Sequence, residues 1–168
     1  KAAIRLGVTK MSANRCFDEI EYLNVDILGM KGKSRVITVP ADIQKLWNDV
    51  RVILRNPVIA RYELKEDIQL GKKAGITALC EYSLLSDNEY PTYAITKKEI
   101  TESGIRKMKQ VHSGEEIGCV VLELGYFIDF KNKKLEDPLS VTLSLTESEK
   151  QDERIGISIK RMLEEYVW

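Results

Sequence analysis

The sequence predicts an α+β protein: a truncated helix-turn-helix with a β-hairpin, followed by an α+β C-terminal domain. Three observations carry this prediction. A capped, amphipathic helix pattern begins near residue 9, an alternating pattern surrounds a basic, Gly-containing centre within residues 26–40, and strand and helix patterns alternate over residues 58–168. The expected divisions are therefore residues 1–40, a linking helix within residues 41–57, and a domain over residues 58–168.

Composition places the chain among ordinary globular proteins. Its 168 residues are 43% hydrophobic and 31% charged, a balance that supports one medium or two small cores. No apolar run approaches the roughly 18 residues of a membrane span, and no signal-peptide pattern is present. The three cysteines have no metal-ligand spacing, which fits a reducing compartment. We therefore expect a cytoplasmic protein with no metal, no cofactor and no membrane partner.

A turn followed by a helix is the first motif of the chain. Gly7 permits the left-handed conformation that ends many helices, and the Thr9 hydroxyl can cap the amides of the next helix. Apolar residues then recur at helical spacing, which places them on one face. They are Ala13, Cys16, Phe17, Ile20 and Leu23. The polar side chains of the first turns stay exposed, where a recognition helix meets base edges. They are Lys10, Ser12, Asn14 and Arg15.

A β-hairpin with a basic tip is expected next, within residues 26–40. Lys31, Lys33 and Arg35 lie at or beside this tip, from which they can reach phosphates or a minor groove. Residues 1–40 carry seven Lys or Arg against four Asp or Glu, a net charge of +3, and the remainder carries 19 against 22, a net charge of −3. The overall net charge of zero therefore conceals a cationic amino-terminal part, which favours a nucleic-acid partner.

Residues 1–40 resemble the winged-helix domains of bacterial MarR-like regulators. The run from Leu6 to Arg15, Leu-Gly-Val-Thr-Lys-x-Ser-x-x-Arg, is similar to the opening of their recognition helix, and the hairpin corresponds to the wing. The resemblance implies a transcriptional regulator that binds double-stranded DNA, and it makes a homodimer one possible assembly. It also implies that the first helix of the winged domain is missing. The expected DNA-binding residues are Thr9, Lys10, Ser12, Asn14, Arg15, Lys31, Lys33 and Arg35.

A protein-docking role is the alternative for this part of the chain, since winged helices also bind proteins. The helix pattern of residues 42–54 is equally open to two interpretations, an intramolecular connector or a dimer contact. Trp47 is the expected anchor in both.

The remaining elements follow from periodicity. Strands are expected over residues 58–64, 91–96 and 118–130, and helices over residues 75–85 and 152–167. Val120, Leu122, Leu124 and Tyr126 share one face of the long strand. The segment at residues 139–145, which follows Asp137-Pro138, fits either a helix or a strand.

Four short motifs in the second half carry a further resemblance. They are the runs from Gly75 to Asp87, Tyr90 to Ile95, Asp137 to Ser140 and Asp152 to Arg154. These runs resemble the C-terminal region of AbiEi-type antitoxins of type IV toxin-antitoxin systems. The resemblance implies a repressor of its own operon with a functional link to a nucleotidyltransferase-like toxin.

A metal-dependent nuclease is the enzymatic alternative. Glu63-Leu64-Lys65 and Asp129-Phe130-Lys131 have the acid-x-Lys spacing with which restriction-type nucleases hold Mg²⁺ and polarise a water, and Glu123 is the candidate additional ligand. Such tripeptides also arise by chance in a chain this rich in charge. His112 has no serine or cysteine motif beside it, so a catalytic triad has little support. We therefore expect a protein that is not an enzyme.

The cysteines, the aromatic residues and a second basic run of the C-terminal domain remain to be interpreted. Cys80 and Cys119 are expected in the core. A set of aromatic residues fits either a core or an effector pocket, namely Tyr62, Tyr82, Tyr90, Tyr93, Tyr126 and Phe130. A second basic run fits either a solvated loop or an auxiliary nucleic-acid or toxin-facing patch, namely Lys97, Lys98, Arg106, Lys107 and Lys109.

Overall fold

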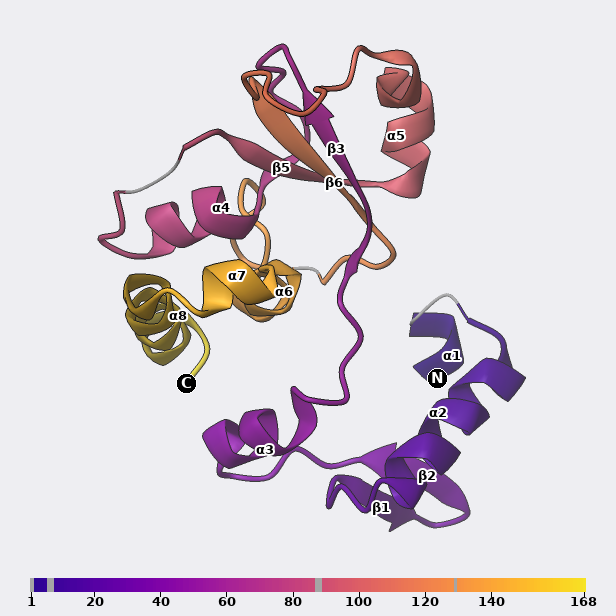
Figure 1. The fold of residues 1–168 in the computed structure, drawn as a ribbon. Helices are drawn as coiled ribbons and strands as arrows, with labels where there is room; N and C mark the ends of the chain where they lie inside the picture. Colours follow the sequence, from indigo (N-terminus) through magenta and orange to yellow (C-terminus); the bar gives the residue numbers. More distant parts are fainter. Residues whose placement is uncertain (1, 6–7, 87–88, 129) are drawn as a thin grey trace. The chain divides into compact units, whose positions relative to one another are not determined.

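Helices and strands are mixed in both halves of the chain, which confirms the α+β class (Figure 1). The computed structural model describes residues 2–5, 8–86, 89–128 and 130–168. The chain divides into two units, Lys1–Leu54 (unit 1) and Arg55–Trp168 (unit 2). Within the described ranges, no helix has both the length and the apolar character needed to cross a bilayer.

Unit 1 begins with two helices and a hairpin, α1 (Ala2–Arg5), α2 (Lys10–Tyr22), β1 (Leu28–Lys31) and β2 (Ser34–Ile37). The Val8 amide donates to the Ala3 carbonyl at 2.9 Å; Gly7, to which the sequence assigns the turn, lies outside the described residues. β1 and β2 are antiparallel, with Lys31 opposite Ser34, so a two-residue loop joins them. Gly32 occupies the first loop position at a φ of +62°, a conformation that glycine adopts without steric cost.

The predicted apolar face of α2 is only partly buried. Ala13 is buried, Phe17 and Ile20 are half-buried, and Cys16 and Leu23 are exposed. The expectation of a continuous core face is therefore wrong for this helix. The physical reason is that α2 packs mainly against α1 and β1, which have four residues each and are too short to cover it.

The helix that follows the hairpin, α3 (Ile43–Val50), belongs to unit 1. Its cap is Asp42, whose carboxylate accepts from the Lys45 amide at 2.8 Å. The helix ends earlier than predicted, and the Ile53 amide then donates to the Val50 carbonyl three positions back, in a tighter turn. Trp47, the expected anchor, is buried.

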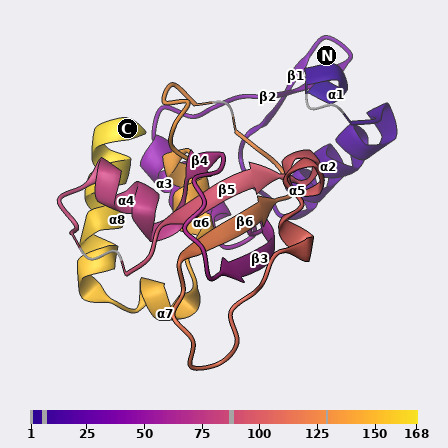
Figure 2. The same ribbon diagram turned by 90° about the horizontal axis from the view of Figure 1, so that it is seen from above.

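Unit 2 contains a four-stranded sheet in the order β3 (Val58–Leu64), β6 (Cys119–Leu124), β5 (Thr92–Thr96) and β4 (Lys72–Lys73) (Figure 2). The β3–β6 and β4–β5 pairs are antiparallel, and β5 and β6 are parallel. A parallel pair needs a crossover connection, and here the crossover contains α5 (Lys97–Ser103) and the 3₁₀ helix η1 (Ile105–Lys107).

Helices cover both faces of this sheet (Figure 1). On one face, Ile100 and Ile105 from the crossover join Cys119 and Val121 in a buried cluster. The other face holds the remaining helices of the unit, α4 (Gly75–Tyr82), α6 (Pro138–Ser144), α7 (Glu147–Lys150) and α8 (Glu153–Tyr166). The apolar cluster on that face includes Val120, Leu122 and Leu124, which confirms the predicted alternation.

Two segments of unit 2 differ from the sequence prediction or complete it. The strand expected over residues 118–130 ends at Leu124, because Leu124 pairs with Val58, the first residue of β3, and no described strand continues beyond this pair. The undecided segment at residues 139–145 lies largely in the α6 helix. Asp137 caps this helix by accepting from the Ser140 amide at 2.9 Å, and Pro138 occupies its first turn, where the absence of an N–H costs nothing.

Candidate nucleic-acid interface

Thr9 caps the amino-terminal end of α2. Its backbone is extended, and its hydroxyl oxygen accepts from the Ser12 amide at 3.0 Å. The same oxygen lies 2.9 Å from the Ser12 hydroxyl. No acidic residue occupies the first turn of this fully described helix. The remaining amides and the positive end of the helix dipole therefore meet no carboxylate from that turn, which favours a bound anion such as a phosphate.

Three exposed polar side chains extend from the first two turns of α2. Lys10 and Asn14 are four residues apart and so lie on one face, and Arg15 follows directly. Neither Lys10 nor Arg15 forms an ion pair with any carboxylate in the described part of the chain. These groups remain available to a ligand that offers acceptors.

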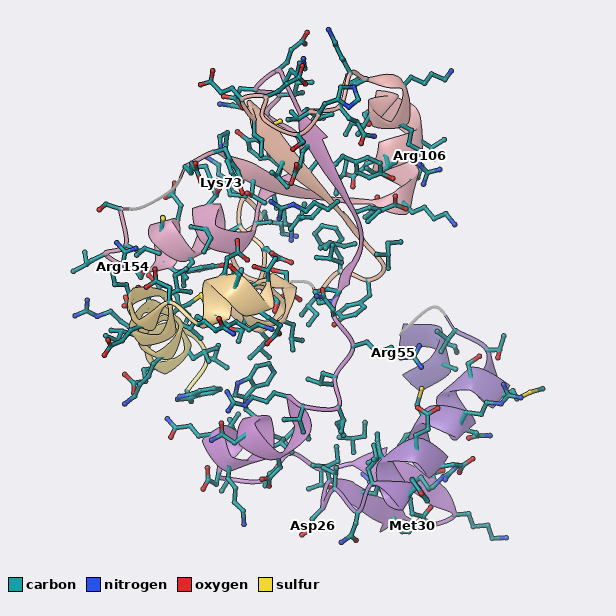
Figure 3. The ribbon with its side chains drawn as sticks, viewed as in Figure 1. Asp26, Met30, Arg55, Lys73, Arg106 and Arg154 are labelled. Atoms are coloured by element: carbon teal, nitrogen blue, oxygen red, sulfur yellow. The ribbon has the colours of Figure 1, made fainter. Side chains whose placement is uncertain are left out.

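The hairpin tip presents a second basic element. Lys31 and Lys33 are exposed, and a Cβ added to Gly32 between them would meet no atom within 4 Å. Met30, labelled in Figure 3, is 66% exposed on β1 beside this tip. The tip is therefore open, and its two lysines flank a glycine that would allow a close approach.

Arg35 differs from the other predicted DNA-binding residues because unit 1 uses it internally. Its guanidinium pairs with Asp18 and lies 3.7 Å from the Glu21 carboxylate. It also lies over the Phe17 ring, 5.2 Å from the ring centroid. Arg35 thus ties β2 to the second half of α2 and compensates two of its acidic groups. The other seven predicted residues are exposed, whereas Arg35 is half-buried.

No local sequence pattern indicates this role of Arg35, since its partner Asp18 is 17 positions away. A cation near a hairpin tip has the same local pattern whether it binds a phosphate or a carboxylate of its own chain. The pairing depends on how the hairpin folds back onto α2.

The two described carboxylates of the nuclease alternative, Glu63 and Glu123, are not brought together. Glu63 accepts from Arg61 at 3.1 Å, and Lys65 pairs with Glu115. Asp129 lies outside the described residues. Within the described ranges, no group of three or more His, Cys, Asp or Glu side chains has an arrangement suited to a metal ion.

Glu123, the candidate additional metal ligand, is occupied by its neighbours. It is buried and accepts from the Tyr62 hydroxyl at 2.8 Å and from the Arg106 guanidinium at 3.1 Å. Burial raises the pKa of Glu123, but these hydrogen bonds and the Arg106 charge outweigh burial and leave the pKa below its usual value. In the register of β3 and β6, Glu63 lies opposite Val120, so these two side chains share one face of the sheet. Glu123 is three positions after Val120, and because side chains alternate along a strand, the Glu63 and Glu123 carboxylates lie on opposite faces. Figure 3 shows Arg106 beside α5.

The described aromatic residues of unit 2 lie in different clusters: Tyr62 and Tyr93 pack beneath α5, and Tyr90 packs in the cluster on the other face of the sheet. Tyr82 and Tyr93 are buried, and Tyr93 packs in the cluster beneath α5. Tyr82 stacks edge-on against Tyr166 with ring centroids 4.9 Å apart. Neither the cavity of about 260 Å³ beside α8 nor the cavity of about 400 Å³ beside Met108 is lined by these aromatic residues.

The second basic run is partly paired, through Lys98 with Glu102 and Arg106 with Glu123. Cys119 is buried as predicted, and burial raises the pKa of its thiol. Cys80 is half-buried, and His112 is exposed.

Comparison with known proteins adds no relative: no known family, curated protein or solved structure matches this chain.

Proposed function

We propose that the chain is a DNA-binding transcriptional regulator whose unit 1 contacts double-stranded DNA through the amino-terminal end of α2 and the β1–β2 hairpin tip. The observation that carries the proposal is the exposed set Lys10, Asn14 and Arg15 at the capped end of α2, whose two cations have no ion-pair partner among the described residues. The open tip with Lys31 and Lys33 supports it. Together these elements offer donors and positive charge at two points of one unit.

The proposed roles follow from the chemistry of each side chain. The α2 amides and the Thr9 and Ser12 hydroxyls would bind phosphate oxygens, which fixes the register on the duplex. Arg15 can donate two hydrogen bonds to a guanine, Asn14 can pair with an adenine edge, and Lys10 can donate to guanine. Lys31 and Lys33 would contact the flanking backbone.

Arg35 receives a different role in this proposal. Because it pairs with Asp18 and Glu21, it acts as a positioning residue that holds the hairpin against α2. It also reduces the negative charge that a phosphate backbone would meet near this helix.

The similarity to MarR-like winged helices supports the choice of DNA over other partners. The motifs similar to AbiEi-type antitoxins favour a repressor that controls its own operon, in functional connection with a nucleotidyltransferase-like toxin. A cytoplasmic location and a homodimer on a palindromic site belong to the same proposal.

Binding to a duplex from upstream of the gene, compared with a random duplex, tests the proposal. We expect Arg15→Ala to lower discrimination between the two duplexes by about 1–3 kcal/mol, because it removes a base contact. Lys33→Ala should weaken both complexes alike and reduce the salt slope by about one, because it removes a phosphate contact. Fluorescence anisotropy over a range of salt concentrations measures both effects.

Lys134→Ala is the matched control, because Lys134 is an exposed lysine of unit 2 outside the second basic run, so this substitution should leave affinity unchanged. Equal losses of discrimination in Arg15→Ala and Lys33→Ala would contradict the assigned roles. Absence of salt-dependent binding, or magnesium-dependent cleavage of the duplex, would contradict the proposed function itself.

A further inference from the structure

A groove in unit 2 runs between α8 and the segment that follows α4. Its volume is about 260 Å³. Leu84 and Leu85 line it from the segment after α4, and Arg154, Ile157 and Arg161 line it from α8. Arg154 is labelled beside α8 in Figure 3. The groove therefore combines apolar side chains with guanidinium groups.

The apolar side chains of this groove are unusually exposed for their unit. Leu84 is 85% exposed and Ile157 is 63% exposed, the two highest values among the large apolar side chains described in unit 2. On the inner side of the same helix, Met162 and Leu163 are buried. Ile157 is thus an apolar residue on the outer, otherwise polar face of an amphipathic helix.

Hydrogen bonds and ring packing fix the walls of the groove. The Ser83 hydroxyl donates to the Leu79 carbonyl at 2.7 Å and accepts from the Leu85 amide at 3.3 Å. Tyr82 packs against Tyr166, which joins α4 to α8. A preformed surface of this kind loses little conformational entropy when a partner binds.

The groove also has a defined charge. Arg154 and Arg161 lie three positions before and four positions after Ile157, so all three share one face of α8. Asp152 holds Arg154 through an ion pair of 2.9 Å. Arg161 is exposed, and no carboxylate in the described ranges forms an ion pair with it. Arg161 is therefore the guanidinium that can receive an external carboxylate.

We propose that this groove binds an acidic, amphipathic segment of a protein partner, which packs apolar side chains against Leu84 and Ile157 and presents a carboxylate to Arg161. The surface belongs to unit 2, and the inference is independent of the DNA contacts proposed for unit 1.

Size favours a protein segment over a small-molecule ligand. A drug-sized ligand needs roughly 300–1,000 Å³, more than this groove provides. One or two inserted side chains of a protein segment fit the available volume.

The test uses the full chain and a fluorescein-labelled peptide of about 15 residues, long enough to form a helix. The peptide carries Leu at helical spacing with Glu beside each Leu, and a second peptide carries Lys in place of Glu. We expect the acidic peptide to bind and the basic peptide not to bind, as measured by fluorescence anisotropy. Ile157→Ser and Arg161→Glu should each weaken binding of the acidic peptide at least tenfold.

Two control variants distinguish binding at this groove from nonspecific binding of the peptide. Ile59→Ser changes a similarly exposed isoleucine on β3, and Lys134→Glu reverses an exposed cation just before α6; both should leave binding unchanged. Arg161→Glu should also gain binding to the basic peptide. All these positions are exposed, and melting temperatures close to that of the unchanged chain verify that the variants fold.

Failure of the acidic peptide to bind would overturn the proposal, as would equal binding by Ile157→Ser or Arg161→Glu. A dimer in solution that Ile157→Ser dissociates would assign the groove to a second copy and overturn it as well. None of these results bears on DNA binding by unit 1, so failures of the two proposals are distinguishable.

Discussion

Unit 1 and unit 2 are stabilised in different ways. In the described part of unit 1, the buried apolar side chains are Ala3, Ala13 and Trp47, whereas unit 2 buries apolar residues on both faces of its sheet. Unit 1 relies on the Thr9 and Asp42 caps, a glycine turn and the Arg35 ion pairs. Since buried apolar area is the main source of folding free energy, we expect unit 1 to unfold locally far more readily than unit 2.

Many large apolar side chains of unit 1 are exposed, among them Met11, Tyr22, Met30 and Val52. The difference between the units shows that clear local signals need not produce a large core. Caps and turns specify where helices and strands begin and end, but burial requires long elements that cover one another.

The largest expected effect comes from truncating a core isoleucine of unit 2. Ile100 is completely buried in α5, while Ile43 of α3 is 39% exposed. Ile100→Ala should lower the free energy of unfolding by about 2–5 kcal/mol, because it leaves a cavity. Ile43→Ala should cost less than about 1 kcal/mol, since Ala also favours helices. Amide hydrogen exchange reports on the stability of each unit separately, so it measures the loss of unfolding free energy in both variants. Equal losses would contradict the contrast between the units.

The second effect concerns the buried carboxyl group of Glu136 in unit 2. Burial is the main cause that raises the pKa of Glu136 to about 8, and the negative charge of Asp137 raises it further. The hydrogen bond from the Gly75 amide opposes this shift and lowers the pKa. One of the Glu136 oxygens has no hydrogen-bond partner among the described residues. The folded state therefore holds a proton that the unfolded chain releases above about pH 4.5.

This proton makes stability fall as pH rises. The Glu136 contribution is fully present below about pH 4.5 and is lost by about pH 8, at a slope of up to about 1.4 kcal/mol per pH unit. Glu136→Gln should remove this slope. The stability of the variant, compared with that of the unchanged protein at the same pH, should therefore be more favourable at pH 8 than at pH 5. Urea unfolding at several pH values tests this, and parallel pH profiles for the two proteins would refute it.

The smallest effect is expected in unit 1, from the Arg35–Asp18 pair. Both side chains are partly exposed, and exposed ion pairs contribute only about 0.2–1 kcal/mol. Arg35→Met, Asp18→Asn and the double variant form a double-mutant cycle. Hydrogen exchange in β1 and β2 should show a coupling free energy in this range. Additive effects of the two substitutions would show that the pair does not hold the hairpin.

Local chemistry allowed much of the fold to be predicted. The Thr9 cap, the hairpin, β3 and α8 follow from patterns within a few residues, and the alternation of β6 follows from its period of two. The exposed residues of the candidate interface were predictable for the same reason, because a helix's first turn and a hairpin tip are surface positions in almost any context.

Long-range contacts decided the rest. The sequence by itself determined the class of most elements and the exposed cations of α2 and the hairpin tip. Only the tertiary structure decided that Arg35 pairs with Asp18, that Glu123 pairs with Arg106, that Glu136 is buried, and that β6 ends where β3 begins. Each of these depends on which distant segments meet, and residue spacing along the chain carries no direct record of that meeting.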